Sequence, residues 1–248
     1  MERDRYILLI DGSTEVCSVA LASERLGIVS SAFESAKSKQ SERLAPMAHE
    51  VLASLPEEGQ LVAVVVAEGP GSYTGLRIVA GYAKGLCMAL GLPLYTMTTT
   101  ELLAHTFLSQ CDDVDRRTLL MPMIDARRME VYAGLYDAEA MSLTDVKALI
   151  LTDPEVQQSI KEAIGDEGEA YFFGSGAEKA VELFHDLLPK AKFQPGIVPD
   201  ASAMMKRAWV LVEGGSSQDV TYWEPFYLKE YQAKVGVPNK VLKRLRKE

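Results

Sequence analysis

The chain has 248 residues, of which 48% are apolar and 25% are charged, and its formal net charge at pH 7 is −9. This length suits one large domain or two small lobes, and the composition is that of an ordinary globular protein rather than a disordered one. Because a negatively charged chain repels nucleic acid as a whole, binding of RNA or DNA would require a local basic patch.

Cysteine usage and hydrophobic patterning bear on the cellular compartment. Cys17, Cys87 and Cys111 are far apart and form no CxxC pair, so we expect reduced thiols rather than a zinc site or a disulfide framework. The opening residues MERDRYILLI contain no signal-peptide run, and no apolar stretch approaches the roughly 20 residues of a membrane helix. We therefore expect a cytoplasmic protein that does not associate with membranes.

The first part of the chain alternates strand and helix signals. Short apolar runs separated by turns predict a meander of hairpins, and LVAVVVA is the continuous apolar run of a strand covered on both faces. Helical spacing predicts a helix with Ser41 as its N-cap and Pro46 at its first turn or at a kink, and a later helix that ends at Gly91. The predicted strands are 6–10, 16–22, 27–33, 61–67 and 94–96, and the predicted helices are 41–55 and 75–90.

The pattern restarts near residue 100, which predicts a second α/β half of about equal size. Residues 141–169 follow no clear pattern. The predicted strands of this half are 119–126 and 130–138, and residues 171–177 are predicted to form a strand followed by a glycine turn. The predicted helices are 100–108, 177–188 and 201–213. We divide the chain into an N-terminal lobe over 1–105, a C-terminal lobe over 106–230 and a basic tail over 231–248.

The stretch AEGPGSYTGLRI at 67–78 has the form of a strand, a glycine-rich loop and a helix, a form that often holds phosphate. A P-loop is excluded because Leu76 stands where its lysine would be. The dinucleotide-binding fingerprint is disfavoured because Gly69, Gly71 and Gly75 are spaced one residue too widely.

A split phosphate cradle is the third design for this loop. In it, the turn Asp11-Gly12-Ser13-Thr14 would supply a carboxylate for a cation and amides for an anion. The alternative is that the loop only turns the chain and that Ser72 or Thr74 caps the helix. The candidate nucleotide-binding residues are Asp11, Ser13, Gly71, Ser72 and Arg77.

The helix after the loop is apolar on most of its faces, which predicts that most of its faces are buried. Opposite its main apolar stripe lie larger side chains and a row of small residues that would permit close helix approach. This second face contains Ile78, Gly81, Tyr82, Gly85, Met88 and Ala89. The face packs either against the 41–55 helix of the same chain or against a second subunit as well.

Five short motifs follow one another along the chain: IDGSTEVCSVAL, GPGSYTGLRI, MIDARRMEVYAGLYD, FFGSGA and EPFYLKE. The second is specific and the others moderately so, and together they resemble the TsaB (YeaZ) family over residues 7 to 230. The family's usual Asp-Thr-Ser turn is here Asp11-Gly12-Ser13, and its usual His-Ser helix opening is Gln40-Ser41.

This resemblance implies a two-lobed actin/Hsp70-like α/β fold (ASKHA, ribonuclease H-like). It implies a non-catalytic scaffold that binds and activates TsaD, the subunit that transfers threonylcarbamoyl to adenosine 37 of tRNA. A small ATPase, TsaE, would join the assembly, and the chain would form a homodimer when alone. The chain would reach tRNA only through the complex and would have no cofactor of its own, with ATP contact only within the complex.

The resemblance also places the contact with TsaD on the two predicted helices of the N-terminal lobe. The partner-binding residues that follow are Leu44, Met47, Val51, Ile78, Gly81, Tyr82, Gly85, Met88 and Ala89.

The histidines of the sequence favour a non-catalytic role. The catalytic relative carries HxxxH on a helix, whereas this chain has only His49, His105 and His185, scattered singly. We therefore predict no catalytic and no metal-binding residue. The alternative is a nucleotide-binding ATPase or kinase-like enzyme of the actin/Hsp70 superfamily.

A third hypothesis is direct tRNA binding through the basic tail, although a run of terminal charges is more often simply solvated. The tail's basic residues near its end are Lys240, Lys243, Arg244, Arg246 and Lys247.

Overall fold

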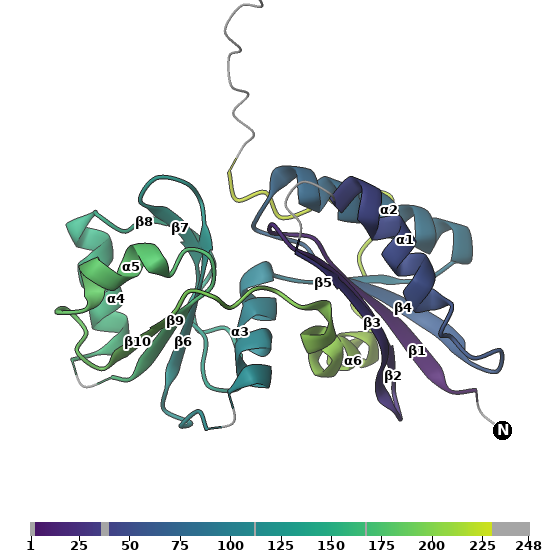
Figure 1. Cartoon of the computed structure of the whole chain (residues 1–248), viewed down its shortest axis with the longest axis horizontal. Coiled ribbons are helices and arrows are strands. Elements are labelled where there is room, and N and C mark those ends of the chain that lie inside the picture. The colour runs from purple at the N-terminus through teal and green to yellow at the C-terminus, as the bar shows by residue number, and fades with distance from the viewer. Residues whose placement is uncertain (1–2, 36–39, 112, 167, 230–248) are drawn as a thin grey trace, which may run out of the picture.

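The computed structural model describes residues 3–35, 40–111, 113–166 and 168–229, and within them the chain forms two α/β lobes. The lobes lie side by side, and helix α3 (Thr99–Gln110) stands between them (Figure 1). Leu102 of this helix belongs to the core of the first lobe, whereas Leu103 and Phe107 belong to the core of the second. A single helix therefore joins the two cores.

The first lobe contains a five-stranded sheet in the order β3-β2-β1-β4-β5. β1, β2 and β3 are antiparallel neighbours, as the predicted hairpin meander requires, and β4 and β5 run parallel to β1. The strands are β1 (Arg5–Asp11), β2 (Cys17–Ser23), β3 (Gly27–Glu34), β4 (Gln60–Ala67) and β5 (Leu94–Met97).

Helices cover both faces of this sheet, which is why its central strands are apolar without alternation. Helices α1 (Gln40–Leu52) and α2 (Tyr73–Leu90) cover one face, and the C-terminal helix α6 (Met205–Gly214) covers the other (Figure 1). The helix α1 begins at Gln40, so Ser41 is not its N-cap and Pro46 lies inside it. The helix α2 is capped by Ser72, and Gly91 ends it in the left-handed conformation, as predicted.

The second lobe repeats the topology of the first. Its sheet has the order β10-β9-β6-β7-β8, which becomes β8-β7-β6-β9-β10 when read from the other edge. In both lobes, the first strand has one antiparallel neighbour that leads to a further antiparallel strand, and one parallel neighbour that leads to a further parallel strand. This duplicated arrangement confirms the two-lobed actin/Hsp70-like α/β fold.

Several elements of the second lobe differ from the sequence prediction. The strand β7 and the helix α5 are shorter than predicted. The strand β8 and the helix α4 lie within 141–169, which follow no clear pattern, and β10 lies in a stretch for which no element was predicted. The elements are β6 (Leu119–Asp125), β7 (Glu130–Ala133), β8 (Lys147–Ile150), α4 (Pro154–Ile164), β9 (Ala170–Phe173), α5 (Glu178–Phe184) and β10 (Ala191–Gln194). Short strands of four residues carry too few side chains to show a period.

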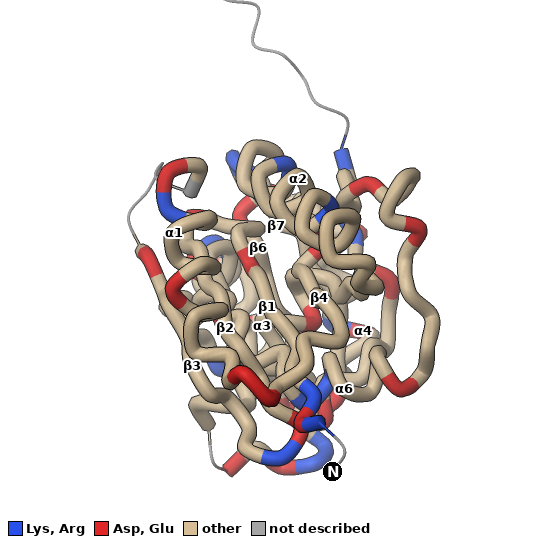
Figure 2. Tube along the Cα trace, turned by 90° about the vertical axis from the view of Figure 1, so that its right-hand side faces the viewer, with Lys and Arg blue, Asp and Glu red and all other residues tan. Residues whose placement is uncertain are grey.

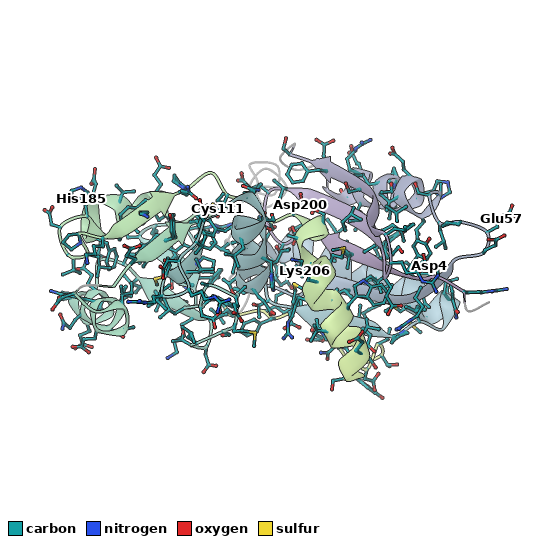
Figure 3. All side chains as sticks on the ribbon, turned by 90° about the horizontal axis from the view of Figure 1, so that it is seen from below. Asp4, Glu57, Cys111, His185, Asp200 and Lys206 are labelled. Atoms are coloured by element: carbon teal, nitrogen blue, oxygen red, sulfur yellow. The ribbon has the colours of Figure 1, made fainter. Side chains whose placement is uncertain are left out.

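The chain returns to the first lobe after β10. The 3₁₀ helix η1 (Ala201–Met204) and α6 pack on the first sheet, where the amide of Ala201 donates to Ser18 Oγ at 2.8 Å. Asp200 lies at the crossing point between the lobes (Figure 3). Further on, the amide of Phe226 donates to the Glu68 carbonyl at 2.7 Å. Residues 201–227 therefore pack on the N-terminal lobe, although the sequence pattern predicted a C-terminal lobe over 106–230.

The basic tail predicted over residues 231–248 lies outside the described residues. Within the described part of the chain, no helix combines the length and the hydropathy needed to cross a bilayer.

Candidate functional site

The first-lobe turn at 11–14 and the glycine loop at 69–72 are in direct contact. The amide of Ser72 donates to the Ser13 carbonyl at 2.6 Å. Gly71 lies so close to this carbonyl that a Cβ atom at position 71 would overlap its oxygen. Four of the five candidate nucleotide-binding residues, Asp11, Ser13, Gly71 and Ser72, are therefore brought together.

Hydrogen bonds within the chain occupy many of the polar groups of this cluster. Ser13 donates both its amide, at 3.1 Å, and its hydroxyl, at 2.6 Å, to Asp11 Oδ1. At the start of α2, the amide of Gly75 donates to Ser72 Oγ and the amide of Leu76 to the Ser72 carbonyl. These contacts hold the loop closed on the turn and cap the helix.

Asp11 lies at the end of β1 and is fully buried. Its Oδ2 atom has no hydrogen-bond partner among the described residues. Burial raises the pKa of the Asp11 carboxyl to about 6, the nearby carboxylate of Asp200 adds to the rise, and the hydrogen bonds from Ser13 oppose it. A charge here is costly because water cannot reach it.

The fifth candidate, Arg77, lies apart from this cluster on the exposed side of α2. Its Nη1 atom donates to the Tyr73 hydroxyl at 2.9 Å, and its guanidinium lies 5.3 Å from the centre of the Tyr73 ring. The ring of Tyr227 packs against Tyr73 with 5.0 Å between the centroids. Arg77 is thus part of an aromatic and basic group at the rim between the lobes.

The second face of α2 is open to solvent. A Cβ atom added at Gly81 or Gly85 would meet no atom within 4 Å. Met88 is 69% exposed and Leu90 is 56% exposed, and Ala89 beside them is also exposed. Ile78 and Tyr82 are half-buried at the edge of the same face and contact the first-lobe core. The small-residue row therefore does not pack against α1.

Three of the predicted partner-binding residues have a different environment. Leu44, Met47 and Val51 of α1 are buried in the core of the first lobe. They pack against the opposite side of α2, so their side chains offer no surface to another protein.

The β6–β7 turn occupies in the second lobe the place of the 11–14 turn in the first. Arg127 and Arg128 have φ values of 72° and 49°, in the left-handed region that costs a non-glycine residue about 1 kcal/mol. Lys179 forms an ion pair with Asp125 at 2.5 Å, and Lys229 forms one with Glu130. In the sequence, the two consecutive arginines between the predicted strands 119–126 and 130–138 are the signal that could have marked this turn as a candidate.

A cavity of about 300 Å³ lies between the lobes. At its wall the Tyr136 hydroxyl is within 2.8 Å of Thr100 Oγ1, and Glu101 Oε1 accepts a hydrogen bond from Arg207 at 2.7 Å. The residues that line the cavity are Thr98, Glu101, Tyr136, Ser142, Asp145, Val146 and Phe226. None of them was a candidate from the sequence. Among the described residues, no group of three or more His, Cys, Asp or Glu side chains is placed to hold a metal ion.

Comparison with known proteins identifies the family. The model of the TsaD family, tRNA N6-adenosine threonylcarbamoyltransferase, matches residues 26–208. The tRNA threonylcarbamoyladenosine biosynthesis protein TsaB of Escherichia coli strain K12 is 28% identical over 238 residues, which cover 94% of this chain and 99% of the relative. TsaB of Bacillus subtilis strain 168 is 36% identical over about half of each chain.

This chain belongs to the TsaB (YeaZ) family. Among solved structures, YeaZ from Pseudomonas aeruginosa superposes with a TM-score of 0.71 at 23% identity, covering 90% of this chain and all of that one. A second Pseudomonas aeruginosa protein, described as similar to peptidase YEAZ, has a TM-score of 0.70 at 24% identity and covers 91% of this chain and all of that one. The two-lobed fold of this TsaB-family chain is thus shared over nearly its whole length.

Substitution by alanine should change the stability of the protein in opposite directions at Gly71 and at Gly81. Gly71→Ala should lower the free energy of unfolding by about 3 kcal/mol, because the new Cβ must displace the Ser13 carbonyl. Gly81→Ala, the matched control on the open face of α2, should raise it by about 1 kcal/mol through helix propensity. Urea unfolding of both variants measures the difference. An equal stability of the two would contradict the close contact.

The buried Asp11 carboxyl should make the free energy of unfolding depend on pH. The folded-state pKa of about 6 exceeds the ordinary 3.8, so the stability that the protonated carboxyl provides is full below pH 3.8 and lost as the pH rises through 6. Asp11→Asn should therefore gain stability over the wild type by about 3 kcal/mol between pH 4 and pH 7. Urea unfolding across this range tests it, with the exposed Asp145→Asn as the control. A gain that does not grow with pH would show that Asp11 is not the titrating group.

Proposed function

We propose that this chain is a non-catalytic subunit that binds and activates a TsaD-like threonylcarbamoyltransferase in the formation of threonylcarbamoyladenosine at position 37 of tRNA. The names of the curated relatives support the pathway, since the Escherichia coli protein aligned over nearly the full chain is a tRNA threonylcarbamoyladenosine biosynthesis protein. The proposed role in binding rests on the open face of α2, which contains Gly81, Gly85, Met88 and Leu90.

The open face of α2 has few side chains that would hold another helix away. A Cβ atom added at Gly81 or Gly85 would meet no atom within 4 Å, so the backbone of another helix can approach closely. Met88 and Leu90 extend the face with apolar surface, and each would gain about 1.5–3 kcal/mol if fully covered. Covering this face with a partner helix is therefore more favourable than leaving it exposed to water.

The remaining parts of the assembly follow as proposals from family membership. A TsaE-like ATPase joins the complex, ATP is contacted only there, and the chain pairs with a second copy of itself when alone. The protein acts in the cytoplasm. The scattered His49, His105 and His185 favour a chain that supports catalysis in its partner rather than one that performs it.

The alternative, a nucleotide-binding ATPase or kinase-like enzyme, draws on the cluster around Asp11. The contacts of this cluster count against it as a phosphate site. Asp11 and Ser13 are fully buried, and the Ser72 amide already donates to Ser13. A phosphate would have to open the loop before it could reach these groups.

Gly85→Arg provides the test of the partner face. It places a long charged side chain on the open face and should abolish the complex with the TsaD-like protein from the same source, as should Tyr82→Glu at the edge of that face. Gly214→Arg is the matched control, because Gly214 also has no atom within 4 Å of an added Cβ but lies on α6, across the sheet from α2. Light-scattering mass of the mixtures measures complex formation.

A complex that survives Gly85→Arg, or one that Gly214→Arg weakens equally, would contradict the proposed face. ATP turnover of the chain alone distinguishes the alternative function. Turnover without the partner, lost in Asp11→Ala, would favour the enzyme.

A further inference from the structure

Basic and aromatic side chains gather at the rim between the lobes, and we call this surface the rim patch. Its residues are Tyr73, Arg77, Arg127, Arg128, Tyr132, Tyr227 and Lys229. Its first half is the stack of Arg77, Tyr73 and Tyr227 described above, in which the Tyr73 ring lies 5.3 Å from the Arg77 guanidinium and 5.0 Å from the Tyr227 ring. Arg77 is exposed, while the two tyrosines are half-buried. One edge of the patch is therefore held by α2 and by the returning C-terminal segment.

The second half of the rim patch comes from the second lobe. Lys229 lies two residues beyond Tyr227 and reaches across to Glu130 at the start of β7. Burial raises the pKa of Tyr132 in the same strand, and the charges of Lys229 and Arg127 oppose the rise, which places both cations near its ring. Figure 1 shows the β6–β7 turn and the end of the described chain at the same side of the molecule as α2.

The charge of this surface is opposite to that of the chain. The ion pairs of Lys179 and Lys229 with carboxylates of the turn are neutral as pairs. Arg77, Arg127 and Arg128 add three positive charges at exposed positions, and the exposed Glu224 near Tyr227 offsets one of them. The chain as a whole carries −9. This is the local basic patch that an acidic chain needs in order to bind a polyanion.

The sequence that follows the described residues is also basic. The described chain ends at Lys229, two residues beyond Tyr227, whose ring packs against Tyr73 at the start of α2, and its last segment is seen beside α2 in Figure 2. The nineteen residues that follow contain six Lys or Arg and two Glu. This stretch, which directly follows the rim patch in the sequence, has more basic than acidic side chains.

The backbone of the β6–β7 turn gives independent evidence. Asn and Gly adopt the left-handed conformation of positions 127 and 128 with little strain, and they are the residues that tight hairpins prefer. Two arginines here work against the turn they occupy. Strained residues cluster where a protein contacts a ligand.

We infer that the rim patch binds single-stranded or loop RNA. Arginine side chains neutralise phosphates, and tyrosine rings provide surfaces on which unpaired bases stack. The identity of the RNA as a tRNA loop rests on the proposed function. Because Arg77 stands four residues before Gly81 on α2, the RNA would lie beside a partner docked on the open face.

The double variant Arg127→Asn and Arg128→Gly tests this inference in the full-length chain. It removes two positive charges and supplies residues suited to the turn, so thermal unfolding should occur at the wild-type temperature or above. Fluorescence anisotropy with a labelled RNA hairpin should show affinity reduced about tenfold at ~50 mM salt. The slope of log affinity against log salt should fall by about two, one for each lost phosphate contact.

Arg116→Asn with Arg117→Gly is the matched control. These two arginines are also consecutive and exposed, but they precede β6 and so lie about 20 Å from the β6–β7 turn. This control should bind RNA as the wild type does. Equal affinity of the Arg127/Arg128 variant and the wild type, equal weakening by the control, or no RNA binding by the wild type at ~50 mM salt would each overturn the inference.

Light-scattering mass with the TsaD-like protein separates this inference from the proposed function. The Arg127/Arg128 variant should form the complex as the wild type does. If no variant and no wild type forms a complex, the proposed function fails, while the RNA measurement on the chain alone still decides the rim patch.

Discussion

The contact between the Ser13 carbonyl and the glycine loop is the constraint on which the first lobe depends. It works only because residue 71 has no side chain, and the hydrogen bond from the Ser72 amide closes it at 2.6 Å. The loop that looks suited to phosphate is thereby used to join the end of β1 to the start of α2. The same closure seals Asp11 away from water.

The position of α2 decides the character of the molecular surface. With its first turn fixed by Ser72, the helix directs one apolar stripe, which includes Val79 and Ala83, into the core. The row of Gly81 and Gly85 then has to face outward, because the side chains of α1 occupy the other side. An apolar helix on the surface of an acidic protein is thus a geometric consequence of how the loop closes.

After β10 the chain returns to the first lobe, and its last described segment contributes side chains to the rim between the lobes. The segment after β10 covers the free face of the first sheet and then passes along the rim, where Phe226 bonds to Glu68 and Lys229 to Glu130. Side chains from α2, from the β6–β7 turn and from this last segment meet there. The two proposed binding surfaces, one apolar and one basic, therefore adjoin at the N-terminal end of α2.

The sequence by itself determined much of the fold of this protein. The continuous apolar run of β4, the hairpin pattern of β1 to β3 and the stop at Gly91 are local signals, and GPGSYTGLRI was specific enough to indicate the family. The tertiary structure alone decided which apolar residues are surface. Leu44 and Met88 look alike in a helical pattern, yet one is buried and the other exposed, because burial depends on which face the neighbouring helix takes. It also decided that segments distant in sequence meet at the rim patch, since long-range packing leaves no period in the chain.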